Sequence, residues 1–94
     1  DVELLGRQEA RTALDAMAGL LEDHPGELNP EDVKQLFRQV TQDTGVKGKL
    51  LFMPVRLAVS GGRHGPDLPT AVAVLGAEES ARLIREALRQ TGGN

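Results

Sequence analysis

The residues best suited to chemistry form a cationic stretch in the middle of the chain. Between residues 47 and 63 there are four basic side chains and no acidic one, and His64 follows directly. Such a stretch favours contact with a polyanion, for example a nucleic-acid backbone. On charge alone, a solvated basic edge without a partner is the more ordinary interpretation. The four basic residues are Lys47, Lys49, Arg56 and Arg63.

The charge of the chain is divided unevenly between its halves. The 94 residues carry a net charge of −3. Residues 1–46 contain ten acidic and four basic side chains, for a net charge of −6. Residues 47–94 contain seven basic and four acidic side chains, for a net charge of +3. We therefore expect one cationic face, with the acidic residues of the first half directed elsewhere.

Patterns typical of catalysis or metal binding are weak. The chain has no cysteine, and its two histidines, His24 and His64, stand forty residues apart without a nucleophile–base pattern. Residues 60–66 (SGGRHGP) lack the Lys-Ser/Thr ending and the preceding strand of a nucleotide-binding loop. We therefore expect no catalytic residue, no metal site and no cofactor in this chain.

The apolar residues recur at helical spacing, and turn residues separate the groups. This pattern predicts helices over residues 2–22, 30–44, from 51 or 52 to 61, 67–75 and 78–89, with residues 91–94 as a frayed tail. Asn29 and Pro30 give the clearest start signal, and Gly45 the matching stop. The prediction is a single all-α domain over residues 1–94, a compact bundle of about five helices. No membrane-spanning run is present, and the absence of cysteine fits a cytoplasmic protein.

The predicted helix before Gly61 is apolar on nearly all sides, so we expect it to be the most buried of the bundle. Pro54 is then expected in its first turn, where a missing N–H leaves no hydrogen bond unmade. The two phenylalanines, Phe37 and Phe52, both stand at core spacing. Arg56 is the anomaly, because an unpaired guanidinium is almost never fully buried.

The same region carries a family resemblance. Residues 45–61 (GVKGKLLFMPVRLAVSG), 64–68 (HGPDL) and 75–76 (LG) resemble, in order and spacing, the C-terminal anticodon-binding subdomain of bacterial glutamyl-tRNA synthetases. The specific likeness covers about residues 45–88, while residues 1–44 are similar only in helical layout. Motifs for ATP binding are absent, so the chain resembles one domain of a larger synthetase, inactive by itself.

The resemblance implies a function and a set of site residues. The parent enzyme activates glutamate with ATP and Mg²⁺ and transfers it to the tRNA, and the domain holds the anticodon loop of glutamate tRNA. By the same resemblance, Arg56 faces the splayed anticodon bases, Gly65, Pro66 and Leu68 line their pocket, and Met53 lies near them. On the basis of their charge, four further residues are expected to contact the RNA backbone: Lys47, Lys49, Arg63 and His64. The other expected partners are the N-terminal domains of the synthetase.

Two alternatives stay open from the residues alone. Arg56 can be a structural arginine that pairs with a carboxylate of the first two helices. The whole domain can be a helical protein–protein interaction module, with the apolar residues 50–59 docking a partner and the basic edge incidental. Salt dependence separates the two functions, because phosphate contacts weaken steeply with ionic strength whereas an apolar groove responds much less.

Overall fold

The computed structural model describes residues 8–61 and 67–92. Within these ranges the chain is helical, contains no strand, and has no helix long and apolar enough to cross a membrane. The prediction of an all-α bundle of about five helices is confirmed. The helices are α2 (Gln8–Glu22), α3 (Pro30–Thr44), α4 (Lys49–Ser60), α5 (Leu68–Leu75) and α6 (Ala77–Gly92).

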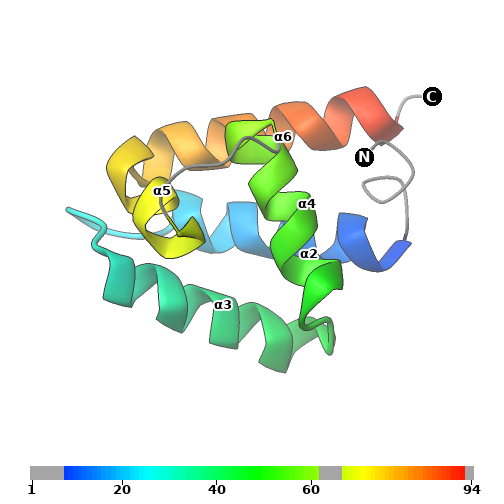
Figure 1. Cartoon of the computed structure of the whole chain (residues 1–94), viewed down its shortest axis with the longest axis horizontal. Coiled ribbons are helices and arrows are strands. Elements are labelled where there is room, and N and C mark those ends of the chain that lie inside the picture. Colours follow the sequence, from blue (N-terminus) through cyan, green and yellow to red (C-terminus); the bar gives the residue numbers. More distant parts are fainter. Residues whose placement is uncertain (1–7, 62–66, 93–94) are drawn as a thin grey trace.

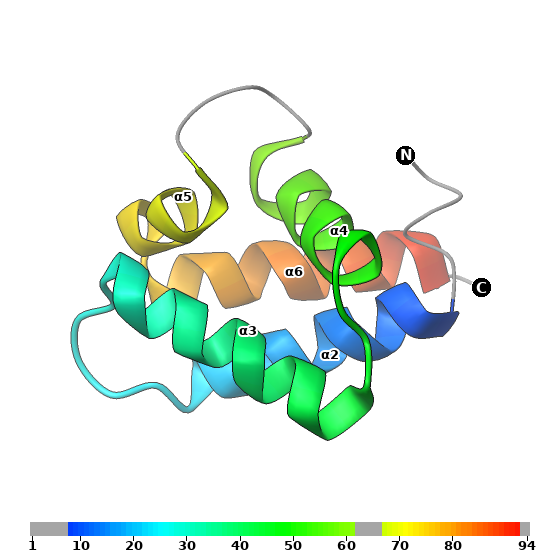
Figure 2. The ribbon, with the colours of Figure 1, turned by 60° about the horizontal axis from the view of Figure 1, so that its bottom comes forward.

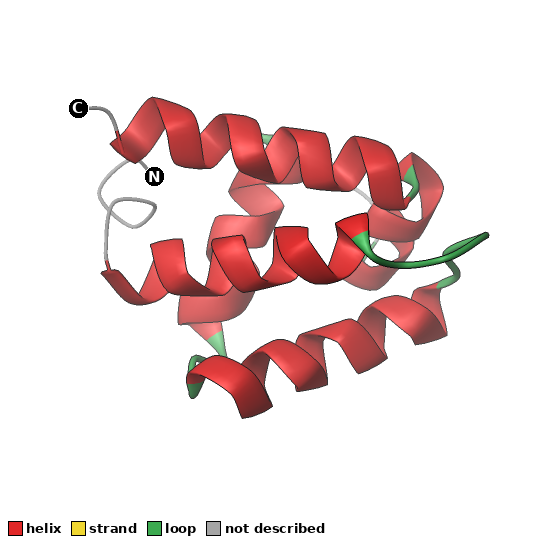
Figure 3. Ribbon diagram, turned by 180° about the vertical axis from the view of Figure 1, so that it is seen from behind, coloured by secondary structure: helices red, strands yellow, loops and turns green. Residues whose placement is uncertain are grey.

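The five helices form two layers. The three longest, α6, α2 and α3, lie side by side with alternating directions and make one layer (Figure 1 and Figure 3). The second layer consists of α4, which crosses α2 and α6, and the short α5, which bridges α3 and α6 (Figure 2). Helix α5 contacts α3, α4 and α6, so it lies beside both α3 and α4.

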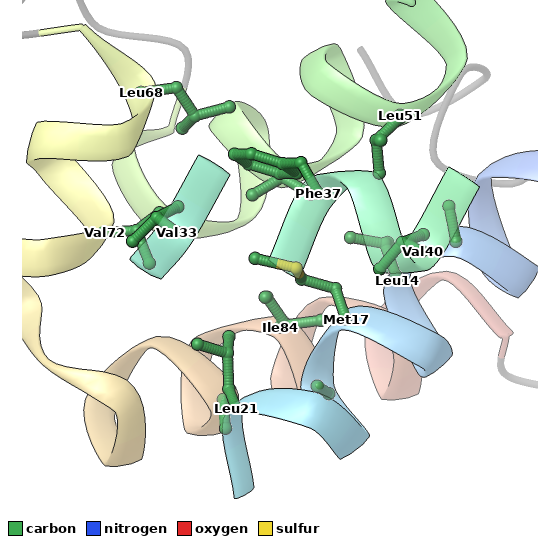
Figure 4. Close-up of a cluster of buried hydrophobic side chains, with 14 of the residues drawn as sticks. Leu14, Met17, Leu21, Val33, Phe37, Val40, Leu51, Leu68, Val72 and Ile84 are labelled. Atoms are coloured by element: carbon green, nitrogen blue, oxygen red, sulfur yellow. The ribbon is translucent and has the colours of Figure 1, made fainter. Parts of the chain in front are cut away.

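The core lies between the layers and is centred on α2. Six residues of α2 are buried, among them Leu14, Met17 and Leu21. They meet side chains from each of the other helices, including Phe37 of α3 and Ile84 of α6 (Figure 4). Apolar residues at steps of three and four place this stripe on one face of α2, so burial of that face accounts for the arrangement of its neighbours.

The expectation that the helix before Gly61 is the most buried was wrong. Helix α4 buries only Leu51, Pro54 and Val55, whereas Phe52 and Met53 are exposed. The physical reason is the position of α4 in the second layer. One side of the helix packs on α2 and α6, and the other side faces solvent. Apolar composition alone does not distinguish a central helix from one whose exposed face is also apolar.

The predicted beginning of α4 was also wrong. The helix begins at Lys49, so Pro54 lies in its second turn and the Leu50 carbonyl lacks the usual N–H partner. Gly48 permits the early start, because it adopts a φ of 64° that side chains disfavour and turns the chain into the helix. Its carbonyl accepts hydrogen bonds from the backbone N–H groups of Leu51 (3.0 Å) and Phe52 (2.9 Å).

The other helix ends follow local signals in the sequence. Asn29 caps α3 by accepting a hydrogen bond from the Asp32 N–H (2.9 Å), and the Asp32 carboxylate accepts one from the Asn29 N–H (3.2 Å). Glycines end α3, α4 and α5 at the predicted positions, Gly45, Gly61 and Gly76. The predicted end at Glu22 is confirmed, whereas the predicted beginning near residue 2 lies outside the described residues. Helix α6 continues to Gly92, two residues into the predicted tail.

An ion-pair cluster joins α2 to α6, which are neighbours in the layer of long helices. Arg85 donates two hydrogen bonds to the Glu22 carboxylate, each 3.0 Å long, and one to Asp15 Oδ1 at 2.6 Å. Two of the acidic residues of the first half are therefore paired with one base from the second half. The same hydrogen bonds raise the pKa of Arg85 and lower the pKa of Glu22.

Replacing Glu22 with glutamine should make the stability of the fold less sensitive to acid. The pKa of Glu22 is below its ordinary value of 4.5 in the folded chain. Its stabilising effect is therefore complete above about pH 4.5 and is lost as the pH falls through the folded-state pKa. In urea unfolding, wild type should be more stable than Glu22→Gln at neutral pH, with a difference that shrinks in acid. A difference that grew toward acid would contradict this account.

Candidate nucleic-acid interface

A groove of about 720 Å³ opens between α3, α4 and the beginning of α5. Its surface is mostly apolar, it carries three cationic side chains, and none of its described lining residues is acidic. A volume of this size is in the range of sites that bind small molecules or single groups of a larger ligand. The lining residues are Lys34, Phe37, Arg38, Thr41, Gln42, Phe52, Arg56, Leu68 and Pro69.

Helix α4 presents a mixed cationic and apolar face beside this groove. Lys49, Phe52, Met53 and Arg56 follow one another at steps of three, one and three residues, which places all four on one side of a helix. Lys49, Phe52 and Met53 are exposed and Arg56 is half-buried. The face therefore combines cations with apolar surface, as contacts to unstacked bases and their phosphates require.

Arg56 lies where its guanidinium is available to a ligand. It lines the groove, and its side chain makes no ion pair or hydrogen bond with any residue in the described ranges. The alternative of a structural arginine paired with a carboxylate of α2 or α3 is therefore contradicted within those ranges. With its aliphatic part packed against the protein and its planar guanidinium accessible, Arg56 can donate two hydrogen bonds to a base edge or stack on a base.

The two phenylalanines have different roles. Phe37 is 5% exposed and belongs to the core, whereas Phe52 is 44% exposed, so the expectation that both are core residues was wrong for Phe52. Their rings form an edge-to-face pair with centroids 5.1 Å apart and planes at 87°. The buried ring thereby holds the exposed one at the wall of the groove.

Two cations of α3 line the groove although the sequence did not predict them as site residues. Lys34 and Arg38 are exposed, one helical turn apart, and line the same groove as Arg56. Their signal is the four-residue spacing of Lys34, Arg38 and Gln42, which marks one polar stripe next to the buried stripe of Val33 and Phe37. This stripe was overlooked because residues 1–46 are acidic overall. The net charge of a segment does not show which face of a helix each charged side chain occupies.

The structure brings some of the predicted site residues together and separates others. Arg56 and Leu68 line the groove, and Leu68 is buried in its wall. Met53 shares the exposed face of α4 but does not line the groove. Lys47, in the loop before α4, and Lys49, its first residue, are exposed and do not line the groove. The remaining predicted contacts, Arg63, His64, Gly65 and Pro66, lie outside the described residues.

Nothing in the described parts of the chain resembles a metal centre. No group of three or more histidine, cysteine, aspartate or glutamate side chains there is arranged to hold an ion. His24 Nε2 is 3.0 Å from the Glu27 carbonyl oxygen and 3.8 Å from Asp32 Oδ2, so this imidazole closes the loop before α3.

The chain matches a known protein family over nearly its whole length. A family model described as an anticodon binding domain covers residues 2–88. No solved structure matches the chain significantly. An anticodon loop offers both phosphates and splayed bases, which are the groups that cationic and apolar side chains bind. The chain therefore belongs to the anticodon-binding domain family and is a tRNA-binding domain of the aminoacyl-tRNA synthetase type.

Proposed function

We propose that this domain reads the anticodon loop of glutamate tRNA for a glutamyl-tRNA synthetase. The observation that carries the proposal is Arg56, which lies at the wall of a cationic groove with no carboxylate partner in the described residues. Three sequence elements support the glutamyl assignment, because their order and spacing resemble those in the anticodon-binding subdomain of glutamyl-tRNA synthetases. They are Lys47-Gly48-Lys49, Pro54-Val55-Arg56 and Leu75-Gly76.

The proposed contacts follow from the chemistry of the groove. The planar guanidinium of Arg56 donates a pair of hydrogen bonds to a base edge, which discriminates between bases. Leu68 and Pro69 supply an apolar wall against which a base can pack. Met53 contacts a neighbouring base from the exposed face of α4, and the predicted contacts of Gly65 and Pro66 complete the site. Base identity is thus read at Arg56, while affinity comes largely from cations.

In this proposal the reaction itself takes place elsewhere in the synthetase. Activation of glutamate with ATP and Mg²⁺, and its transfer to the tRNA, belong to N-terminal domains of the cytoplasmic parent enzyme. The role of the present domain is to hold the anticodon, so that only the matching tRNA is positioned for transfer. Its partners are therefore glutamate tRNA and those N-terminal domains.

Binding of anticodon stem-loops tests the proposal directly. The 94-residue chain should bind a glutamate anticodon stem-loop more tightly than the same stem with a scrambled anticodon, and affinity should fall steeply with salt. Equal affinity for both loops at every salt concentration would overturn the glutamyl assignment. Absence of any salt-dependent RNA binding would favour the protein–protein interaction module instead.

Replacing Lys49 with alanine should weaken binding to all stem-loops alike. Lys49 is exposed at the first position of α4, where a cation is unfavourable for the helix dipole, so its removal should leave the fold intact. Loss of one phosphate contact should lower the slope of log affinity against log salt by about one. The measurement is a salt titration with glutamate and scrambled stem-loops. A loss confined to one anticodon would contradict the phosphate role.

A further inference from the structure

We propose that Phe52 is a stacking platform for one unpaired base of the bound loop, and that Lys34 and Arg38 hold the phosphates beside it. This inference rests on the proposed function and adds three residues to its site. None of them was identified from the cationic stretch or from the family resemblance. They are brought together by the packing of α3 against the second layer.

The Phe52 ring is exposed and yet packed against another ring. A phenylalanine at 44% exposure leaves a large apolar surface in water, and its exposed part lines the groove. The ring is nevertheless fixed, because the buried ring of Phe37 contacts it in an edge-to-face pair. A base that stacks on a ring already held in place loses less conformational entropy than one that must order a mobile side chain. Phe52 thus offers an aromatic surface of the kind that single-stranded RNA binders use.

The charge of the groove has a single sign. Every charged residue that lines the described groove is a cation, and these cations come from both sides, Lys34 and Arg38 from α3 and Arg56 from α4. A neutral or basic peptide would not be complementary to a groove that has three cations and no carboxylate among its described lining residues. The surface is complementary to a ligand that is flat and apolar at its centre and anionic at its edges, as a nucleotide is.

The two cations on α3 have a spacing that suits neighbouring phosphates. Lys34 and Arg38 are exposed and separated by one helical turn, about 6 Å along the axis. They can contact successive phosphates on either side of the stacked base. Their ammonium and guanidinium groups are unpaired within the described ranges, so no ion pair has to be broken before RNA binds. Arg56 remains free to read the edge of a base.

The test is a double-mutant cycle between the protein and the loop. Stem-loops in which each loop base in turn is replaced by an abasic site should be titrated with wild type, Phe52→Leu and Phe52→Tyr. We expect Phe52→Leu to weaken binding of the intact loop about fivefold or more. At one loop position, removal of the base should cost wild type affinity but cost Phe52→Leu almost none. Phe52→Tyr, which keeps the ring, should behave as wild type.

Two controls separate stacking from folding. Val74→Ala removes an apolar side chain that is 79% exposed on α5 and does not line the groove, so it should bind as wild type does. Thermal unfolding should show that Phe52→Leu is folded at the temperature of the titrations. For the phosphate contacts, Lys34→Gln and Arg38→Gln should each lower the salt slope by about one without changing anticodon preference.

The outcomes distinguish this inference from the proposed function. If wild type prefers the glutamate loop while Phe52→Leu shows the same affinity and the same abasic losses at every position, stacking on Phe52 is overturned and the function stands. If Lys34→Gln and Arg38→Gln leave the salt slope unchanged, the phosphate contacts are overturned. If wild type binds no stem-loop, both the inference and the proposed function fail.

Discussion

Replacement of Arg56 with alanine should weaken binding of the glutamate anticodon stem-loop by about 1–3 kcal/mol, which is the cost of a lost base contact. The physical reason is that the guanidinium lines the groove and, within the described residues, has no other partner. The fold should survive, because no described ion pair or hydrogen bond of the side chain is lost. Binding should be measured by fluorescence anisotropy, and folding by circular dichroism.

The Arg56 substitutions should also change the preference of the domain for one anticodon over another. Arg56→Ala should reduce the preference for the glutamate anticodon, because a scrambled loop does not offer the base edge that Arg56 reads. Arg56→Lys is the matched variant, since it keeps the charge but lacks the planar fork, and it should restore only the part of the affinity that is due to charge. A folded Arg56→Ala domain with unchanged affinity would remove this residue from the site.

Replacement of Leu14 with alanine should destabilise the domain by about 2–5 kcal/mol. Leu14 is fully buried at the centre of α2, among side chains from both layers (Figure 4). The loss combines the transfer free energy of the removed atoms with the cavity that a close-packed core cannot fill. Because a domain of this size is stable by only about 5–15 kcal/mol, the effect should be evident in urea unfolding curves.

A matched control uses an apolar side chain outside the core. Val74→Ala truncates a largely exposed residue, so its free energy of unfolding should stay within about 0.5 kcal/mol of wild type. If Leu14→Ala unfolded at nearly the same urea concentration as Val74→Ala, α2 would not be the centre of the core. The same comparison for Leu51→Ala would show how much of the core α4 contributes.

The sequence predicted the parts of the fold that depend on local chemistry. The cap at Asn29 and the glycines after α3, α4 and α5 act within a few residues, so their effect is visible without tertiary structure. The beginning of α4 was missed because it depends on a positive φ at Gly48, and a glycine tolerates several backbone conformations equally well. The burial of α4 was missed because composition does not reveal which layer a helix occupies.

The candidate site was predictable only in part for a similar reason. Arg56 was identifiable because a cation on an apolar helix is anomalous. Leu68 was expected in the pocket from the family resemblance, and the structure places it in the groove wall. The contribution of α3 was not identified, because only tertiary packing places Lys34 and Arg38 in the same groove as Arg56. Their four-residue spacing marks a stripe on a helix, but the partner of that stripe is set by the fold.

The most direct test of the central claim is an amide chemical-shift titration of the chain with a glutamate anticodon stem-loop and with a scrambled one. We predict shifts that depend on the anticodon and gather around Arg56, Phe52, Leu68 and the groove side of α3, with little change at the Arg85 cluster between α2 and α6. Shifts that are the same for both loops, or that gather between α2 and α6, would contradict recognition of the anticodon in the groove.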